Sequence, residues 1–273
     1  MLFLIAAIFM AVLSLLYLLL IFPGRNTGKM ERFLHRTYAH RGLHDDAAGI
    51  PENSILAFAA AVEAGYGIEL DVHLTKDEQL AVFHDDTLTR MCGVQGNVKD
   101  RTLAQLQSLF LAGTKERIPS FDELLRLVDG RVPLIIEIKG QSTDAKVSQK
   151  VHERLQSYCG DYVIESFNPV YLRWWLKNAP DVPRGQLSAD LLKKGAKGFR
   201  DRVQRWGVKH LLTNFLARPD FIAYDWQDAG GLSLRMCRSL FRSAIVFWTI
   251  KNQDTFNRVK SRCDAVIFEG FFP

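Results

Sequence analysis

Cysteine is scarce in this chain, and its distribution excludes several kinds of site. Cys92, Cys159, Cys237 and Cys263 show none of the short paired spacings that a zinc site or a redox motif needs. Low-complexity tracts and convincing internal repeats are also missing, and no Pro/Gly/Ser-rich linker interrupts the chain after residue 30. We therefore expect cysteines that are buried or kept reduced, and a single soluble domain.

Charged side chains are absent from Met1 through Gly24. An apolar stretch of about 20 residues, at 1.5 Å per residue, matches a bilayer core of about 30 Å. The alternative is a cleaved signal peptide, but no Lys or Arg precedes the apolar run and no small-x-small cleavage site follows it. Residues 1–23 are therefore predicted to form one transmembrane anchor.

Positive charge dominates the next segment, residues 24–36, which we interpret as a basic juxtamembrane linker. It contains Arg25, Lys29, Arg32 and Arg36 against the single acid Glu31. Because short basic flanks tend to remain cytoplasmic, we expect a single-pass membrane protein with its soluble domain, residues 37–273, in the cytoplasm. The net charge of +5 would draw that domain towards anionic lipids or phosphorylated substrates.

Short apolar or β-branched runs alternate with helical patterns along the soluble part, as expected of an α/β protein with a parallel sheet. The expected strands are 38–40, 68–74, 80–84, 134–139, 162–167, 210–213, 244–250 and 265–268. A (β/α)₈ TIM-type barrel with its site at the carboxyl ends of the strands is the preferred architecture. A doubly wound open sheet is the alternative, but no Gly-rich phosphate loop follows the first strand.

One connection breaks the alternation. Residues 75–79 are too few for a parallel crossover, so 68–74 and 80–84 should form an antiparallel hairpin that brings His84 back beside Asp71. Between the first two strands, Asn53 can cap a helix that begins near Ile55.

Three carboxylates interrupt apolar strands. Glu69 and Asp71 are two residues apart and share one face of a strand, as do Glu137 and Lys139 on another. Buried carboxylates that converge repel one another unless a cation lies between them, and oxygen ligands favour Mg²⁺ or Ca²⁺. The alternative is that each carboxylate forms its own salt bridge with a nearby Arg or Lys. We predict one divalent cation held by Glu69, Asp71 and Glu137.

Two of the seven histidines, His40 and His84, stand at strand ends among these charged residues. A histidine pair can act as general base and general acid, because an unperturbed pKa near 6.5 lets one ring accept a proton while the other donates one. Such a pair suits displacement at phosphorus. The other five histidines are interpreted as structural.

Six short strings carry a family resemblance. They are Ala39-His40-Arg41-Gly42, Pro51-Glu52-Asn53-Ser54, Glu69-Leu70-Asp71-Val72, Phe83 through Arg90, Ile118 through Leu125, and Glu137-Ile138-Lys139. In this order and spacing they resemble the glycerophosphodiester phosphodiesterase family. Weaker matches follow at Ser166-Phe167 and at 248–252, whereas the last strand ends in Phe268-Glu269 where the family often has Thr-Asp.

The resemblance implies a barrel enzyme that hydrolyses glycerophosphodiesters to sn-glycerol 3-phosphate and an alcohol. It implies that the three carboxylates hold the metal, that His40 and His84 form the acid-base pair, and that Arg41 and Lys139 bind the phosphate. Glu52 is expected to support the phosphate side of the site. Trp248 is a candidate cover for the glycerol moiety, with ordinary barrel packing as the alternative.

Substrate and partners stay open at this point. A soluble glycerophosphodiester is one candidate; a lysophospholipid headgroup cleaved at the membrane is another, and a catalytically silent lipid or phosphate sensor is a third. Nucleic acid is not expected as a partner, since no nucleic-acid motif is present. Segment 191–210 is basic and amphipathic, and could lie on anionic lipid. We favour an outer barrel helix with a solvated charged face.

Overall fold

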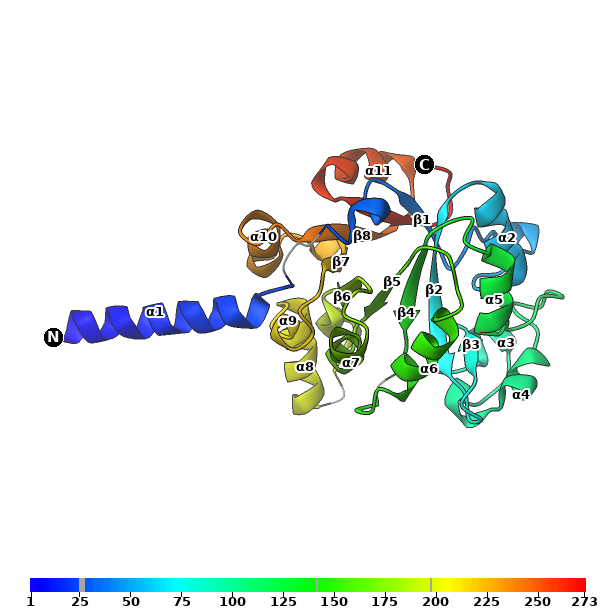
Figure 1. Ribbon diagram of the computed structural model, residues 1–273, viewed down its shortest axis with the longest axis horizontal. Helices are drawn as coiled ribbons and strands as arrows, with labels where there is room; N and C mark the ends of the chain where they lie inside the picture. The colour runs from blue at the N-terminus through cyan, green and yellow to red at the C-terminus, as the bar shows by residue number, and fades with distance from the viewer. Residues whose placement is uncertain (25–27, 141, 197) are drawn as a thin grey trace.

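A closed barrel of eight parallel strands forms the body of the protein in the computed structural model, which describes residues 1–24, 28–140, 142–196 and 198–273 (Figure 1). The barrel strands are β1 (Thr37–His40), β2 (Gly67–Leu74), β4 (Leu134–Ile138), β5 (Tyr162–Ser166), β6 (Arg184–Ser188), β7 (Phe221–Asp225), β8 (Ala244–Ile250) and β9 (Ala265–Phe268). Each pairs in parallel with the next, and β1 pairs with both β9 and β2, which closes the ring. The TIM-type barrel expected from the sequence is confirmed.

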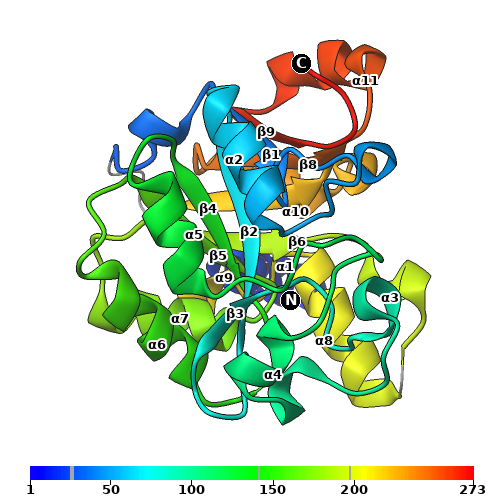
Figure 2. The same cartoon turned by 90° about the vertical axis from the view of Figure 1, so that its right-hand side faces the viewer.

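Helices surround the barrel (Figures 1 and 2). They are α2 (Ile55–Glu63), α3 (Thr89–Cys92), α4 (Leu103–Gln107), α5 (Phe121–Val128), α6 (Lys146–Leu155), α7 (Pro169–Asn178), α8 (Phe199–Lys209), α9 (Asn214–Ala217), α10 (Leu232–Ser239) and α11 (Gln253–Val259). Short 3₁₀ turns lie at η1 (Glu31–Phe33), η2 (Asp46–Ala48), η3 (Val98–Asp100), η4 (Leu191–Lys194), η5 (Trp226–Asp228) and η6 (Lys260–Arg262). Ser54, not Asn53, caps α2, because the Ser54 hydroxyl accepts the hydrogen bond from the Ala57 amide.

The predicted hairpin is present. Strand β3 (Leu80–Val82) pairs antiparallel with β2, and the Phe83 amide donates a hydrogen bond to the Asp71 carbonyl at 3.0 Å. The strand lies outside the barrel ring and, among the strands that the structure describes, pairs with β2 alone. His84 follows it directly and is thereby returned to the carboxyl end of β2.

Two barrel strands differ from the prediction. Residues 210–213 are not a strand: His210 ends α8, and turns follow it. The fifth and sixth barrel strands are instead β6 and β7, neither of which was predicted as a strand. Strand β6 was missed because it carries polar residues whose groups are satisfied inside the protein: Arg184 pairs with Asp220 at 3.1 Å, and Ser188 donates to the Val208 carbonyl at 2.8 Å.

Two apolar layers hold the barrel together. One lies between strands and helices and includes Trp175 and Phe121; the other fills the barrel interior and includes Tyr38 and Phe221. Gly185 of β6 is required by this interior, because a Cβ at that position would lie 2.2 Å from the Phe221 ring. Met30 and Phe33, from the segment that precedes β1, are buried in the interior group.

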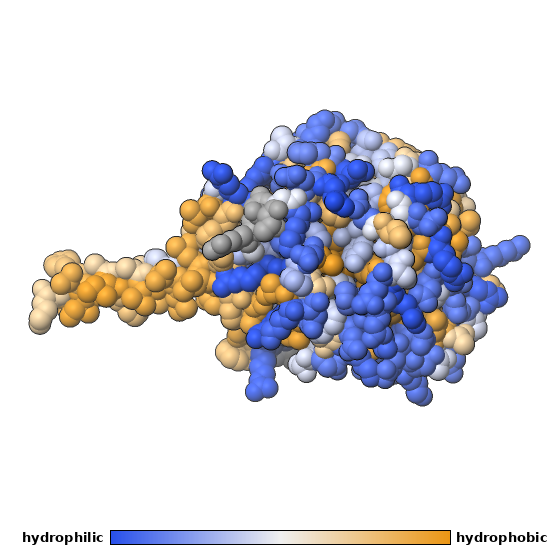
Figure 3. Space-filling view, viewed as in Figure 1, coloured by the Kyte–Doolittle hydropathy of each residue, from blue (hydrophilic) through white to orange (hydrophobic). Residues whose placement is uncertain are grey.

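Helix α1 (Leu2–Ile21) projects from the barrel and is long and apolar enough to cross a membrane (Figures 1 and 3). Its last turn packs into the domain. The Tyr17 hydroxyl lies 2.9 Å from the Ser233 hydroxyl, and Asn214 Nδ2 donates to the Ile21 carbonyl at 3.0 Å. Residues 25–27 of the predicted linker, which include Arg25, lie outside the described residues, and so does Lys197 of the predicted basic helix.

Candidate active site

The three predicted metal ligands meet at the carboxyl ends of β2 and β4. Asp71 is the register partner of Glu137 on the neighbouring strand, and Glu69 lies two residues before Asp71 on the same face. One carboxylate oxygen from each lies within 4.8 Å of the others, and all three side chains are buried. The tertiary structure therefore brings together residues that the sequence separates by up to 68 positions.

Burial and mutual repulsion oppose the joint ionisation of the three carboxylates. Burial, reinforced by Asp71, raises the pKa of Glu69 well above its ordinary value, and burial raises the pKa of Glu137 to about 7. Burial also opposes ionisation of Asp71, but Lys139, His84 and Arg41 hold the pKa of Asp71 well below its usual range. A buried set of carboxylate oxygens with this much repulsion fits a hard divalent cation such as Mg²⁺ or Ca²⁺.

Lys139 supplies part of the neutralising charge. Its Nζ lies 2.9 Å from Asp71 Oδ1 and 2.7 Å from Glu137 Oε2. Glu69 is not part of this pairing: its Oε2 accepts a 3.2 Å hydrogen bond from the Arg41 amide and lies 4.0 Å from His40 Nε2. The salt-bridge alternative considered for the sequence therefore accounts for two of the carboxylates, and among the described residues Glu69 forms no salt bridge with a Lys or Arg side chain.

The His40 ring is hydrogen-bonded to the carboxylate of Glu269. It ends β1, and its Nδ1 lies 2.6 Å from Oε2 of Glu269, which follows the adjacent strand β9. Lys251 Nζ binds the other oxygen of Glu269 at 2.9 Å. Burial lowers the pKa of His40, and the hydrogen bond from His40 lowers the pKa of Glu269. This arrangement leaves His40 Nε2 directed to the side where Glu69 lies.

His84 belongs to a chain of ion pairs that ends at Arg41. His84 Nδ1 lies 2.6 Å from Asp85 Oδ1. Arg90 joins Asp85 to Glu52: its Nε lies 2.6 Å from Asp85 Oδ2, and its Nη2 lies 2.6 Å from Glu52 Oε1. Glu52 Oε1 then accepts from Arg41 Nη1 at 2.9 Å. Glu52 thus pairs with Arg41, the phosphate-binding candidate, and its supporting role at the phosphate side of the site stays a prediction. Burial lowers the pKa of His84 to about 4.

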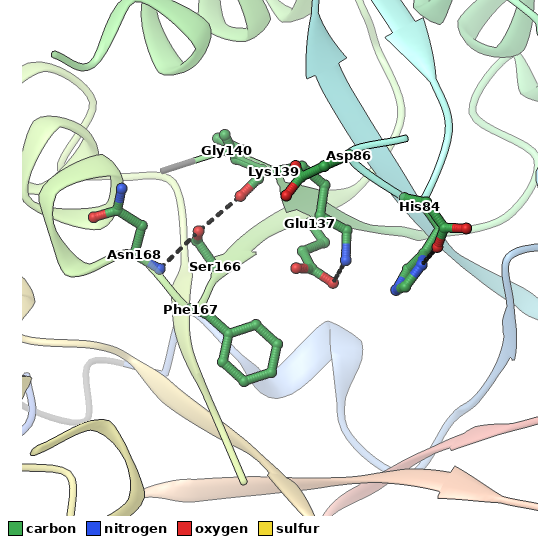
Figure 4. A pocket seen from close by; sticks show the side chains of 10 residues that line it. His84, Asp86, Glu137, Lys139, Gly140, Ser166, Phe167 and Asn168 are labelled. Atoms are coloured by element: carbon green, nitrogen blue, oxygen red, sulfur yellow. Dashed lines mark hydrogen bonds and ion pairs between the residues drawn. The ribbon is translucent and has the colours of Figure 1, made fainter. Parts of the chain in front are cut away.

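These side chains line a cavity of about 330 Å³ at the mouth of the barrel. Its polar wall includes His40, His84 and Lys139, and its apolar wall includes Phe167 and Trp248, whose ring centroids are 5.9 Å apart in an edge-to-face contact. An adjoining hollow shares His84, Glu137, Lys139 and Phe167 and extends towards Asn168 (Figure 4). Of the predicted site residues, all except the fully buried Asp71 line the first cavity.

Three further residues belong to the site and were not assigned to it from the sequence. Asn53 Nδ2 donates to Asp71 Oδ2 at 2.8 Å, which explains why Asn53 is not a helix cap. Glu165 of β5 is the register partner of Glu137 and lines the cavity. Glu269 holds His40. The signal available for Glu165 was an acid inside an apolar strand, the same signal that identified Glu137.

Comparisons with known proteins identify a family and a shared fold. The sequence profile of the glycerophosphoryl diester phosphodiesterase family matches residues 40–268. The glycerophosphodiester phosphodiesterase of Caldanaerobacter subterraneus is 40% identical over 161 residues, 55% of this chain and 65% of that protein. A rat lysophospholipase D is 35% identical over 156 residues, 52% of this chain and 48% of that protein.

Among solved structures, a phosphodiesterase of Oleispira antarctica in complex with the product sn-glycerol-3-phosphate superposes with a TM-score of 0.70. The two sequences are 21% identical, and the match covers 87% of this chain and 94% of the other. At this identity the likeness shows a shared barrel fold.

Proposed function

The chain belongs to the glycerophosphoryl diester phosphodiesterase family and is a phosphoric diester hydrolase, and from this we propose that it hydrolyses glycerophosphodiesters to sn-glycerol 3-phosphate and an alcohol with one divalent cation, Mg²⁺ or Ca²⁺. The observation that carries the proposal is one cavity lined by His40, His84 and members of a buried carboxylate cluster. A binding module would not need such an acid-base pair.

Glu69, Asp71 and Glu137 would hold the cation. When bound, it supplies Lewis-acid polarisation of the phosphoryl group. Arg41 and Lys139 neutralise the charge that grows on the non-bridging phosphate oxygens. Trp248 and Phe167 cover the apolar side of the glycerol moiety.

His40 and His84 move the protons. Nδ1 of His40 is hydrogen-bonded to Glu269 and Nδ1 of His84 to Asp85, so each ring offers its Nε2 to the substrate. One ring takes the proton of the attacking hydroxyl, from water or from the substrate's own glycerol, and the other protonates the departing alkoxide. Burial lowers the pKa of both rings and so favours their neutral form, whereas an anionic phosphodiester beside them favours the charged imidazolium that an acid requires.

The test is choline release from glycerophosphocholine by the full chain in detergent, with Mg²⁺, with Ca²⁺ or with EDTA. We use the full chain because the last turn of α1 packs into the domain. We expect EDTA, His40→Ala and Glu69→Gln each to remove the activity, and the control His35→Asn to retain it, since His35 is exposed and Asn tolerates its positive φ. Release that survives EDTA would contradict the metal-dependent mechanism.

A lysophospholipid, cleaved as by a lysophospholipase D, is a second candidate substrate. It is favoured by α1, which would keep the enzyme at a source of lysophospholipid, and by the similarity to the rat lysophospholipase D. Choline release from lysophosphatidylcholine in vesicles, compared with release from glycerophosphocholine, decides between the two substrates. No turnover of either, with binding retained, would favour a lipid or phosphate sensor.

We also propose that α1 anchors the enzyme in a membrane, with the catalytic domain in the cytoplasm. Lys29, Arg32 and Arg36 follow the apolar helix, which supports this orientation. The complete burial of Ile21 supports retention of the helix, because removal of a signal peptide would empty part of the domain's own packing. Digestion of the catalytic domain by protease added to right-side-out vesicles would contradict this topology.

A further inference from the structure

Helix α8 turns its apolar stripe outwards. Phe199, Val203 and Trp206 follow one another at intervals of four and three residues and are 82%, 49% and 49% exposed. At 100° per residue they share one face, and Val208, the buried residue of this helix, lies on the opposite face. The outer barrel helix with exposed charged side chains that the sequence favoured is present, but its apolar stripe is exposed as well and does not pack against the barrel.

Charge lies beside the stripe. Arg200 and Arg202 are exposed, one towards each side of the apolar face, and α8 carries four basic residues against the single acid Asp201. A helix with an apolar face and flanking arginines has the chemistry of one that lies in the boundary between lipid headgroups and acyl chains. The flanking charge favours an anionic lipid surface.

The position of α8 relative to α1 also favours a lipid surface as the partner of this apolar face. Figures 1 and 2 both place α8, α9 and α10 around the end of α1 that enters the domain. Exposed apolar side chains also occur on these helices at Phe215 of α9 and Leu232 of α10, which are 43% and 57% exposed. The orange surface in Figure 3 accordingly continues from α1 onto the adjoining side of the domain.

The junction between α1 and the domain is a packed one. Arg218 Nη1 donates to the Phe22 carbonyl at 3.1 Å, and the Phe22 ring lies edge-to-face against Phe241 at 5.0 Å. The Gly24 amide donates to the Pro219 carbonyl at 2.8 Å, and a Cβ on Gly24 would lie 2.7 Å from the Arg218 carbonyl oxygen. Because these contacts lie on both sides of the helix end, they fix the position of the domain relative to α1 and so relative to the bilayer that α1 would span.

We propose that the face formed by Phe199, Val203, Trp206, Phe215 and Leu232 is a second membrane contact, inserted at the lipid headgroup boundary of the membrane that α1 spans. Segment 191–194, which leads into α8, also reaches the catalytic cavity, because Leu191 lines it. The contact would therefore place the rim of the cavity beside the lipid surface. This inference rests on the proposed anchoring by α1, and its test separates the two.

The test uses nitroxide labels on the full chain in vesicles of phosphatidylcholine and phosphatidylglycerol. In a background with Cys92→Ser and Cys159→Ser, single cysteines replace Phe199, Val203 or Gln204, and a fourth variant carries Ala7→Cys in α1. Collision rates with oxygen, which concentrates in lipid, and with a water-soluble nickel chelate are measured for each label. Gln204 is the matched control, because it is exposed on α8 but lies off the apolar face.

We expect the ratio of oxygen to nickel collisions to be several-fold higher at positions 199 and 203 than at 204, and high at position 7. Equal, water-like ratios at 199, 203 and 204 with a lipid-like ratio at 7 would overturn the second contact while α1 stays inserted. Labels at 199 and 203 that are shielded from both reagents would also overturn it, because they would indicate a second protein copy on this face. A water-like ratio at 7 would overturn the anchoring and this inference together.

Discussion

His40 Nδ1 and Glu269 Oε2 lie 2.6 Å apart across the seam where β1 pairs with β9. The two residues are 229 positions apart in the chain and meet only because the barrel closes. A carboxylate bonded to Nδ1 fixes which ring nitrogen carries the proton and directs Nε2 into the site.

Glu269→Gln is therefore expected to lower kcat and leave KM nearly unchanged. An amide can accept the bond but does not stabilise the imidazolium, so we expect a loss of about tenfold to a hundredfold, part of the 10²–10⁴-fold that a positioned acid or base contributes. Steady-state kinetics on glycerophosphocholine measure it. Glu269→Asp should recover part of kcat, and an effect confined to KM would indicate a substrate-binding role instead.

Cation binding should stabilise the protein, and more strongly at higher pH. In the cation-free protein the pKa of Glu137 is raised to about 7 and that of Glu69 is also raised, so binding must release protons and tightens as pH rises through this range. At 100 times Kd, a ligand of the folded state adds about 2.7 kcal/mol. Thermal unfolding with and without Mg²⁺ or Ca²⁺ at pH 6 and pH 8 measures the effect.

Glu69→Gln should remove most of that stabilisation, whereas Glu153→Gln, an exposed helix position, should keep it. A cation effect of equal size in both variants would place the ion elsewhere on the protein.

Glu165→Gln should stabilise the cation-free protein. Glu165 is 1% exposed, its Oε2 has no partner among the described residues, and burial raises its pKa well above the ordinary value. The folded state therefore holds this proton more tightly than the unfolded state, so the free energy of unfolding falls as pH rises from the ordinary Glu pKa through the folded one. A glutamine at this position does not ionise, so the variant lacks this fall in the free energy of unfolding.

For Glu165→Gln we expect a higher Tm in EDTA at pH 8 and a smaller difference at pH 5; a gain of about 1 kcal/mol corresponds to about 2–4 °C. Differential scanning calorimetry on the full chain, beside Glu153→Gln, measures it. A difference that grows as pH falls would contradict a buried, protonated Glu165.

Asn214→Ala should loosen the junction between α1 and the domain. Asn214 is fully buried and donates to the Ile21 carbonyl, so its removal leaves a buried acceptor short of its main partner at a cost of about 1–3 kcal/mol. We expect a lower Tm and faster proteolysis between α1 and β1. Asn257→Ala, at an exposed position of α11, is the control; equal losses in both would mean that the junction contributes nothing specific.

The sequence alone determined how several of the candidate site residues are placed. Glu69 and Asp71 interrupt an apolar strand at a spacing of two, and this predicted a shared face; the five residues of 75–79 predicted the hairpin that returns His84. These inferences succeeded because they depend on strand periodicity and chain length, which are local properties. Strand β6 escaped the same reasoning, because its Arg, Gln and Ser are satisfied by distant partners that no local pattern reveals.

Only the tertiary structure decided which groups complete the site and which helix face meets solvent. Glu269 reaches His40 through closure of the barrel, and Arg90 links Glu52 to Asp85 through side chains that approach in space. The periodicity of α8 identified an apolar stripe correctly, but a helix can be rotated about its axis without any change in its sequence. Packing against the barrel buried Val208 and left Phe199 outside, because the direction of a stripe is set by the neighbours that it contacts and not by its spacing.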